Sequence, residues 1–284
     1  MKKIIGILLR FGTFLRRLTR SKSGLGGMLI LSFWVAITIL TLFWTPHSIT
    51  QFHLDRRLQP PSSEFIFGTD KFGRDVLSRV LAGSREVIVL ALTGTLLGLI
   101  LGTVIGLTAG YVGGLYDEIA MRLMDIFMSF PALLLALLVL GMLGPGLINV
   151  IMVIGVVFSP RVARVARSAV LDIRFKEFVE AAKSRGENSL YLMGVEILPN
   201  ALGPLGVEFA VRFAYAIFLS ASLGFLGLGV QPPAPDWGLM VSEGRDFMQF
   251  APWVVLFPAL AIASLVVGVN LLSDAVRQLA AGEI

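Results

Sequence analysis

The chain alternates long apolar runs with short polar segments along its whole length. A helix that crosses a lipid bilayer needs about 20 mostly apolar residues, and the sequence offers six such stretches. We expect transmembrane helices near residues 24–44, 87–116, 120–141, 147–168, 204–229 and 251–272. The pattern therefore predicts an all-α, polytopic membrane protein with six transmembrane helices.

The third and fourth spans come from one uncharged stretch, from Ile126 to Pro160. This stretch is too long for a single span. Its centre reads GMLGPG, from Gly141 to Gly146, and glycine beside proline is typical of a turn. We therefore predict two membrane helices with a turn between them.

The most polar long stretch is the loop 169–203, between the fourth and fifth spans. Its apolar residues predict a short helix over 174–185 with one apolar face, made by Phe175, Phe178, Val179 and Ala182. A solvated linker is the alternative. Small alanines beside glutamates instead favour a helix that docks into a groove of another protein, because small side chains permit close approach.

Gly186 is predicted to end this helix, because glycine accepts the left-handed conformation that terminates many helices. Ser189 can then cap a second short helix, whose apolar spacing is carried by Leu190, Met193 and Ile197. Pro199 follows. The loop is thus predicted to be a helix, a glycine elbow and a second helix, lying across the membrane face.

The remaining polar segments complete the predicted plan. Residues 1–23 combine an apolar helical face with arginines, and we expect an amphipathic helix on the inner membrane surface. Residues 45–86 are predicted to be an external loop that contains an interfacial helix. Residues 87–284 would form the membrane core, with the second to sixth spans and the polar loop.

Composition supports a membrane protein and excludes several kinds of chemistry. Hydrophobic residues make up 56% of the chain and charged residues 15%, whereas a soluble domain has about 25% charged residues. The chain contains no cysteine, so disulfides and thiol catalysis are excluded. Its two histidines, His47 and His53, are too few to build a metal site, and we expect no metal.

The net charge of +5 is explained by orientation in the membrane, so we expect no nucleic-acid partner. With the N-terminus inside, the internal segments hold sixteen Lys and Arg residues and the external loops hold seven. Positive residues gather on the cytoplasmic side of membrane proteins. Both termini are therefore predicted to be cytoplasmic, and the polar loop 169–203 with them.

The segment GTDKFGRD has glycines at the spacing of a phosphate-binding loop, Gly68 and Gly73. That loop requires a lysine followed by serine or threonine to reach the phosphates and Mg²⁺. Here Arg74 and Asp75 stand in those places, and the predicted topology puts the segment outside the cell. The chain is therefore expected to have no ATP site of its own.

The second span carries a glycine at every fourth position. Small residues at this spacing let helix backbones approach closely in lipid. The stripe predicts helix packing within the chain or, as the alternative, an interface that slides when the protein changes state. Its members are Gly94, Gly98, Gly102, Gly106 and Gly110.

Charged residues near the spans form three further groups. Glu208 and Arg212 lie four residues apart in the fifth span, where they either line a water-filled path or pair structurally near the inner interface. A second group, expected to lie among lipid headgroups, consists of Arg161, Arg164 and Arg167. A third, expected to pair internally or with the polar loop, consists of Asp117, Arg122 and Asp125.

The polar loop resembles the cytoplasmic motif of the membrane subunits of bacterial ABC importers. In that family Glu-Ala-Ala is followed by a glycine and, about a dozen residues on, by Leu-Pro. The resemblance implies that the helix is a coupling helix, docked in a cleft of an ATP-hydrolysing subunit. The residues that match the motif are Glu180, Ala181, Ala182, Gly186, Leu198 and Pro199. Glu177 and Lys183, which are charged residues of the same helix, complete the expected docking surface.

Further stretches resemble the dipeptide/oligopeptide/nickel branch of this family, in its C-type permease component. They are FGTDKFGRDVLSRVLAGSR, GGLYDEIAMRLMDIFMSFP and ASLGFLGLGVQPPAPDWG, and together the resemblance extends over nearly the whole chain from residue 24. The C-terminus, SDAVRQLAAGEI, departs from the family because it lacks an Asp-Pro ending. The role of this tail is left open.

Two external segments are expected to lie at the outer mouth of the path. The first, GTDKFGRD, would shape this mouth, and the second, QPPAPDW, would by its position gate it or meet a binding protein. For the first of them a purely structural role is the alternative. The residues concerned are Asp70, Arg74, Asp75, Gln231, Asp236 and Trp237.

The resemblance implies a permease subunit of an ATP-driven importer in the bacterial inner membrane, and not an enzyme. Its partners would be a homologous second permease, two cytoplasmic ATPase subunits that bind ATP and Mg²⁺, an extracytoplasmic substrate-binding protein and membrane lipid. Di- and oligopeptides are the leading substrates by family. Nickel chelates, glutathione-like thiols and small glycosides remain open, as does the identity of the two ATPases.

The alternative function is a self-sufficient secondary carrier or channel. Such a protein needs ion-coupling groups near the midplane and often contains inverted repeats. The sequence has no evident repeat, and Glu208 with Arg212 is its only candidate charge pair. An integral-membrane enzyme is a third class, but no cluster of nucleophile, base or metal ligands supports it.

Overall fold

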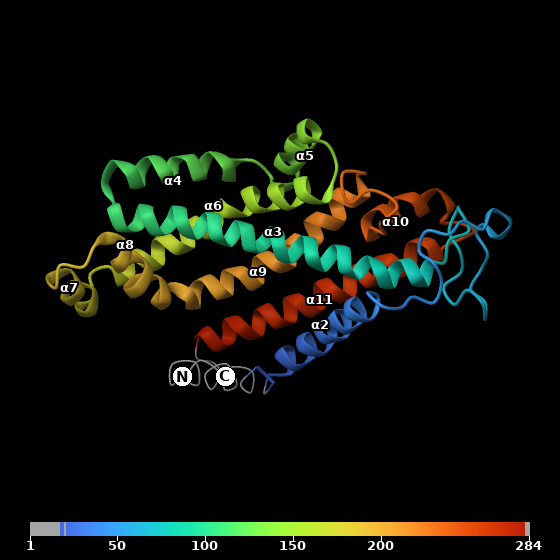
Figure 1. Cartoon of the computed structure of the whole chain (residues 1–284), viewed down its shortest axis with the longest axis horizontal. Coiled ribbons are helices and arrows are strands. Elements are labelled where there is room, and N and C mark those ends of the chain that lie inside the picture. Colours follow the sequence, from blue (N-terminus) through green and yellow to red (C-terminus); the bar gives the residue numbers. More distant parts are fainter. Residues whose placement is uncertain (1–17, 20, 282–284) are drawn as a thin grey trace. The chain divides into compact units, whose positions relative to one another are not determined.

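The computed structural model describes residues 18–19 and 21–281. Most of the predicted amphipathic segment 1–23 and the end of the C-terminal tail lie outside this part of the chain. Within it the protein is helical, and its only β-type pairing is an isolated bridge between Thr69 and Asp75 (Figure 1). This confirms the all-α prediction.

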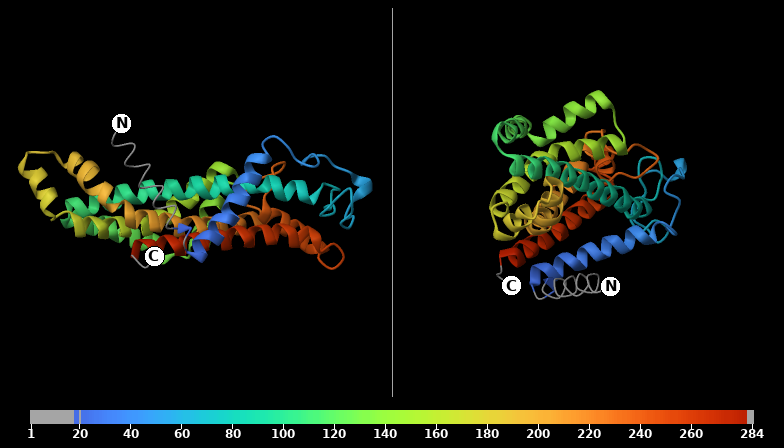
Figure 2. Two further views of the ribbon diagram at one scale, coloured as in Figure 1. Left: turned by 90° about the horizontal axis from the view of Figure 1, so that it is seen from below. Right: turned by 60° about the vertical axis from the view of Figure 1, so that its left-hand side comes forward.

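The chain forms two compact units. The terminal unit comprises residues up to 88 together with those from 232 onward, and the central unit comprises residues 89–231. Figure 2 shows the same ribbon from two further directions.

Among the described residues, five helices are long and apolar enough to cross a membrane, and a bent pair makes a sixth crossing if it counts as one span. The five are α2 (Lys22–Leu40), α3 (Val76–Val112), α6 (Leu147–Ile173), the continuous run Ser189–Phe225 and α11 (Trp253–Ala281). The bent pair is α4 (Gly114–Ser129) and α5 (Ala132–Leu143).

The third span is not the single straight helix that we predicted over 120–141. It breaks between Ser129 and Ala132, and the two halves meet at 90°. The cause is Pro131, because a proline disfavours the helical conformation of the residue before it. Phe130 is accordingly extended, with φ −88° and ψ 137°.

The predicted turn between the third and fourth spans is confirmed. α5 ends at Leu143 and α6 begins at Leu147. Gly144 and Gly146 have φ values of +83° and +144°, a region that glycine enters without steric cost. The side-chain amide of Asn149 donates to the carbonyls of Leu143 and Gly144, at 3.0 and 3.1 Å, and holds the turn closed.

In the terminal unit α2 and α11 lie side by side (Figures 1 and 2). Two glycines permit their close approach. A Cβ atom built on Gly27 would lie 2.6 Å from the backbone nitrogen of Leu272, and one on Gly268 would lie 2.6 Å from the side chain of Ile30. The Trp34 indole donates to the Ser264 hydroxyl at 3.0 Å, which adds a polar tie between the two helices.

The predicted interfacial helix within 45–86 is absent as a separate element. Between α2 and α3 the only helical element described is the short 3-10 turn η1 (Leu54–Arg56). Residues 76–86 instead form the first turns of α3, because the Asp75 carboxylate accepts from the Ser78 amide at 2.9 Å, as an N-cap does. Nothing interrupts the helix beyond it.

The central unit is built on α3 and α6, with α4, α5 and α9 (Leu198–Phe225) packed around α6. The glycine stripe of α3 faces α6 within this chain. Cβ atoms on these glycines would collide with α6 at each successive turn, meeting Ile154, Gly155, Ser159, Ala163 and Val170. The two backbones are therefore close enough that only hydrogen atoms fit between them.

Gly102→Ala is expected to destabilise the α3–α6 pair, because the added Cβ would lie 2.5 Å from both the Ser159 carbonyl and the Val162 Cβ. Overpacking of this kind costs about 1–3 kcal/mol. The thermal unfolding midpoint of the purified chain in detergent measures it. The matched control is Gly206→Ala in α9, where a Cβ has nothing within 4 Å. Equal midpoints for the two variants would contradict the packing argument.

Candidate functional site

The first helix of the polar loop is α7 (Glu177–Ser184). It follows an extended Lys176 and carries Glu177 and Glu180 in its first turn. Acidic side chains there interact favourably with the partial positive charge of the helix N-terminus. The predicted helix is therefore present, three residues shorter at its start and one at its end than 174–185.

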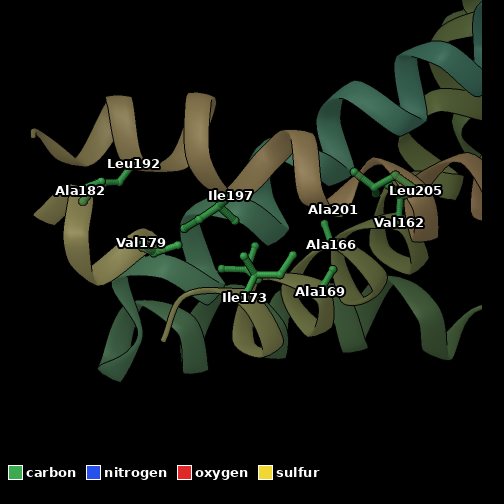
Figure 3. Close-up of a cluster of buried hydrophobic side chains, with 11 residues drawn as sticks. Val162, Ala166, Ala169, Ile173, Val179, Ala182, Leu192, Ile197, Ala201 and Leu205 are labelled. Atoms are coloured by element: carbon green, nitrogen blue, oxygen red, sulfur yellow. The ribbon is translucent and has the colours of Figure 1, made fainter. Parts of the chain in front are cut away.

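Only one side of α7 is buried. Val179 and Ala182 insert into a hydrophobic cluster with Ile173, Leu192 and Ile197 (Figure 3). Further members come from α6 and α9, namely Val162, Ala166, Ala169, Val170, Ala201 and Leu205. The cluster joins the end of α6, the whole of α7 and the start of the fifth span into one packed body.

This burial corrects two sequence expectations. Ala182 was predicted to face a partner protein, but its exposure is 0% and it packs inside the chain. Phe175 and Phe178 were predicted to share one apolar face with Val179 and Ala182, but they are 68% and 38% exposed, whereas Val179 and Ala182 are buried. The apolar spacing identified the helix correctly. It did not determine which apolar side chains would face inward, because that depends on how the helix lies against α6 and α9.

The glycine elbow has the expected conformation. Gly186 has φ +84°. Its amide donates to the Lys183 carbonyl at 3.0 Å, and the Glu187 amide donates to the Ala182 carbonyl at 3.3 Å. These two bonds form a Schellman motif, which closes a helix with glycine at the first position beyond its cap.

The second short helix differs from the prediction in its cap and in its length. Asn188, not Ser189, is the cap, and its side chain accepts from the Tyr191 amide at 2.8 Å. The helix begins as α8 (Ser189–Tyr191), passes through a π-helical turn η2 (Leu192–Ile197) and continues as α9. Pro199 lies directly after the π-helical turn, within this continuous run. The elbow is therefore directly continuous with the fifth span.

The outward side of α7 carries most of the predicted docking residues. Glu177, Glu180, Ala181 and Lys183 are exposed, as is Pro199, whereas Leu198 is half-buried against the cluster. A groove of about 750 Å³ lies beside the helix, between it and the end of α3, lined in part by Tyr111, Arg174, Glu180 and Lys183. Together with Phe175 and Phe178, this makes a surface that is both charged and apolar.

We had expected the three arginines of α6 to lie among lipid headgroups. Two of them instead pair with carboxylates of α4. Arg167 donates to both oxygens of Asp117, at 2.5 and 2.6 Å, and Arg164 donates to Asp125. The acidic residues therefore pair neither with one another nor with the polar loop. The third arginine of the group, Arg161, has no hydrogen bond or ion pair with any described residue.

The Glu208–Arg212 pair forms within α9, with 2.5 Å between the Glu208 Oε1 and the Arg212 Nε. Both side chains are largely buried. The Arg212 guanidinium also lies 5.3 Å from the centre of the Tyr215 ring and 5.9 Å from that of Phe158. Arg212 and Tyr215 belong to the wall of a cavity of about 470 Å³ beside the α4–α5 bend. The pair is thus both structural and adjacent to a cavity.

Most residues predicted to shape an outer mouth are instead buried within the terminal unit. Arg74 binds Asp70 at 2.6 Å and Glu243 at 3.3 Å, which ties the Gly68–Asp75 segment to α10 (Trp237–Gly244). Asp75 caps α3, Asp236 caps α10, and the Trp237 indole donates to the Val80 carbonyl at 2.8 Å. Only Gln231, in the central unit, is exposed.

The comparisons with known proteins bear directly on these features. Residues 102–281 match the family model of the binding-protein-dependent transport system inner membrane component. The chain belongs to this family. The matched range contains α7, the elbow and the fifth span.

Several curated relatives are similar to this permease-family chain over most of its length. It is 41% identical to the dipeptide transport system permease protein DppC of Alkalihalophilus pseudofirmus, covering 92% of this chain and 86% of the relative. It is 38% identical to the di/tripeptide permease protein DppC of Pseudomonas aeruginosa, with 93% and 89% covered. It is 37% identical to the glutathione permease protein GsiD of Pectobacterium atrosepticum, with 93% and 88% covered.

A solved structure supports the same fold. A chain of the MetNI methionine ABC transporter in an inward-facing conformation matches with a TM-score of 0.57 and 19% identity, covering 72% of this chain and 96% of that one. The protein is therefore a multi-pass inner-membrane permease component of an ABC transport system. Family membership decides against the self-sufficient carrier or channel.

Gly186→Ala is expected to loosen α7 without unfolding the membrane core. A side chain in the left-handed region costs about 1–2 kcal/mol, while no atom within 4 Å would touch the added Cβ. Hydrogen exchange of the α7 amides should accelerate about fivefold or more. Gly194→Ala in η2 is the control, because that Cβ is equally free of contacts and the backbone has no positive φ. Unchanged exchange in Gly186→Ala would argue against the motif.

Proposed function

We propose that α7 is the element through which an ATP-hydrolysing partner subunit drives this permease. The observation that carries the proposal is the division of α7 into two sides. Val179 and Ala182 anchor it in the cluster of Figure 3, while Glu177, Glu180 and Lys183 remain exposed. A helix held in this way presents a rigid outer surface and transmits displacement inward.

The path of transmission follows the buried cluster. α6 contributes Val170 and Ile173, and the fifth span contributes Ile197, Ala201 and Leu205. Because the interior is close-packed, a shift of α7 cannot be absorbed locally. The ends of both membrane helices must move with it. Binding and hydrolysis of ATP with Mg²⁺ occur on the partner, and this chain contributes the mechanical link.

Phe175 and Phe178 are the contacts that the sequence motif did not identify as part of this surface. Large exposed apolar side chains beside charged ones are typical of a protein interface. We propose that these two phenylalanines enter the cleft of the ATPase. Ala181 would permit close approach of α7 to the partner, and the charged residues of α7 would set the register of the contact. This side of the protein is then cytoplasmic, as are both termini.

We propose di- and oligopeptides as the transported substrates, on the basis of the relatives named for dipeptide and di/tripeptide transport. A second, homologous permease would complete the path, two ATPase subunits would power it, and an extracytoplasmic binding protein would deliver the peptide. The relative named for glutathione transport is compatible with this class, because glutathione is itself a small peptide.

Substitutions of two adjacent alanines test docking of the ATPase and transmission of its movement separately. Ala181→Arg is expected to abolish co-purification of the ATPase from native membranes while the second permease is retained, because Ala181 is exposed on α7. Ala182→Leu is expected to retain the ATPase but to lose stimulation of ATP hydrolysis by the loaded binding protein, because Ala182 is fully buried.

The control for docking is Ala280→Arg, the same substitution at an exposed alanine in the last turn of α11. Purification and mass spectrometry of each complex measure the outcome. Retention of the ATPase by Ala181→Arg at the level of the control would show that α7 is not the docking surface.

ATP-driven uptake tests the substrate. Proteoliposomes that contain the complete transporter are expected to accumulate a labelled dipeptide when ATP and the binding protein are supplied, with or without a proton gradient. Unlabelled tripeptide should compete, whereas a nickel chelate or a glycoside should not. Competition by either of the latter, with no effect of peptides, would reassign the substrate class.

A further inference from the structure

The α4–α5 bend borders a cavity of about 470 Å³ in the central unit. Its walls come from both arms of the bend, from α6 and from α9, and they include Phe130, Phe158, Arg161, Arg212 and Tyr215. This volume lies within the range of about 300–1,000 Å³ that is usual for small-molecule sites. Aromatic rings with a few polar groups are also the usual lining of such sites.

Arg161 is the unusual member of this wall. Of the three arginines spaced along α6, Arg164 and Arg167 each bind a carboxylate of α4. Arg161 binds none of the described residues, is exposed and faces the cavity. A charge on a membrane-spanning helix is costly and normally has a partner or borders a water-filled path. Arg161 therefore lacks the counter-charge that its neighbours have.

Arg161 lies near the middle of α6. The helix extends from Leu147 to Ile173, further than the sequence had predicted. At 1.5 Å per residue, Arg161 lies about 20 Å from either end. The whole helix is about 40 Å long, which exceeds the ~30 Å hydrocarbon core of a bilayer. Since Arg161 also lies on the cavity wall, its counter-charge comes either from a headgroup or from a solute in the cavity, and the lipid titration below distinguishes the two.

The other charges of the cavity do not supply it. Arg212 is the second cation of the wall, and its charge is already balanced by Glu208 at 2.5 Å. The rings of Tyr215 and Phe158 face the same guanidinium. The cavity thus carries one uncompensated positive charge, on a guanidinium whose planar donor fork matches a carboxylate.

We propose that Arg161 binds the C-terminal carboxylate of the transported peptide while the peptide occupies this cavity. The inference rests on the proposed function, since every unmodified peptide has such a carboxylate. The aromatic wall then contacts the peptide side chains without selecting among them. Arg161 is a specificity-determining residue for a free carboxylate, and it is separate from the docking surface on α7.

The test measures binding to the complete transporter in phosphatidylcholine nanodiscs without the binding protein, so that the selectivity of that protein does not enter. The probes are labelled alanyl-phenylalanine and its C-terminal amide, up to about 10 mM. The wild type is expected to bind the free acid about tenfold more tightly than the amide. Arg161→Gln should bind both with the affinity of the amide, and Arg161→Lys should retain part of the preference.

Arg164→Gln is the matched control, because Arg164 lies one turn away on α6 and pairs with Asp125 outside the cavity wall. It is expected to keep the preference for the free acid. Equal loss of both probes in Arg161→Gln, an undiminished preference in that variant, or no binding of the free acid by the wild type would each overturn the proposal. Repeating the titration with phosphatidylglycerol present identifies a headgroup role, which would appear as competition by lipid, and this outcome also overturns it.

Uptake by the same wild-type transporter, reconstituted in proteoliposomes and supplied with the binding protein, tests the proposed substrate class separately from the carboxylate site. If ATP-driven peptide uptake occurs but Arg161→Gln does not change the acid-to-amide ratio, the carboxylate site is wrong and the proposed function stands. If the complete transporter takes up no peptide, the proposed substrate class fails and the carboxylate assignment fails with it, while the docking role of α7 is tested separately by co-purification.

Discussion

Burial of Val179 and Ala182 against Ile173, Leu192 and Ile197 holds a short polar helix to the ends of two long apolar ones. An eight-residue helix is not stable alone in water, because nucleation costs more than so few hydrogen bonds return. α7 is helical because this packing stabilises it, with full burial of a valine side chain contributing about 1.5–3 kcal/mol. The same contacts tie α7 to α6 and to the start of the fifth span.

The charged residues of α6 and of the fifth span are constrained by the cost of an unpaired charge in a membrane helix. A guanidinium on a spanning helix must find a carboxylate, a headgroup or water. Arg164 and Arg167 find Asp125 and Asp117 on α4, which fastens that helix to α6. Glu208 and Arg212 satisfy one another within a single helix. Arg161 has no carboxylate partner among the described residues and lies on the wall of the cavity.

The α4–α5 bend and the glycine stripe have opposite effects on packing. Glycines along α3 bring two backbones together and leave no space between them. Pro131 instead turns the chain by 90° and opens a space beside α6. A permease needs both, because the scaffold must remain packed while the path through it must accept a solute.

The sequence by itself determined the helical class, the turn at Gly144 and Gly146, the short polar helix before the fifth span and the glycine elbow at Gly186. These features depend on local chemistry, namely apolar run length, positive φ and residue spacing. Only the tertiary structure decided that Ala182 faces inward and Phe178 outward, that Asn188 caps a helix continuous with the fifth span, and that the residues of the supposed outer mouth are mostly buried. Residues distant in the sequence determine which side of a helix is covered. They also determine which of three equally spaced arginines lacks a carboxylate partner. A local sequence pattern contains no information about such distant neighbours.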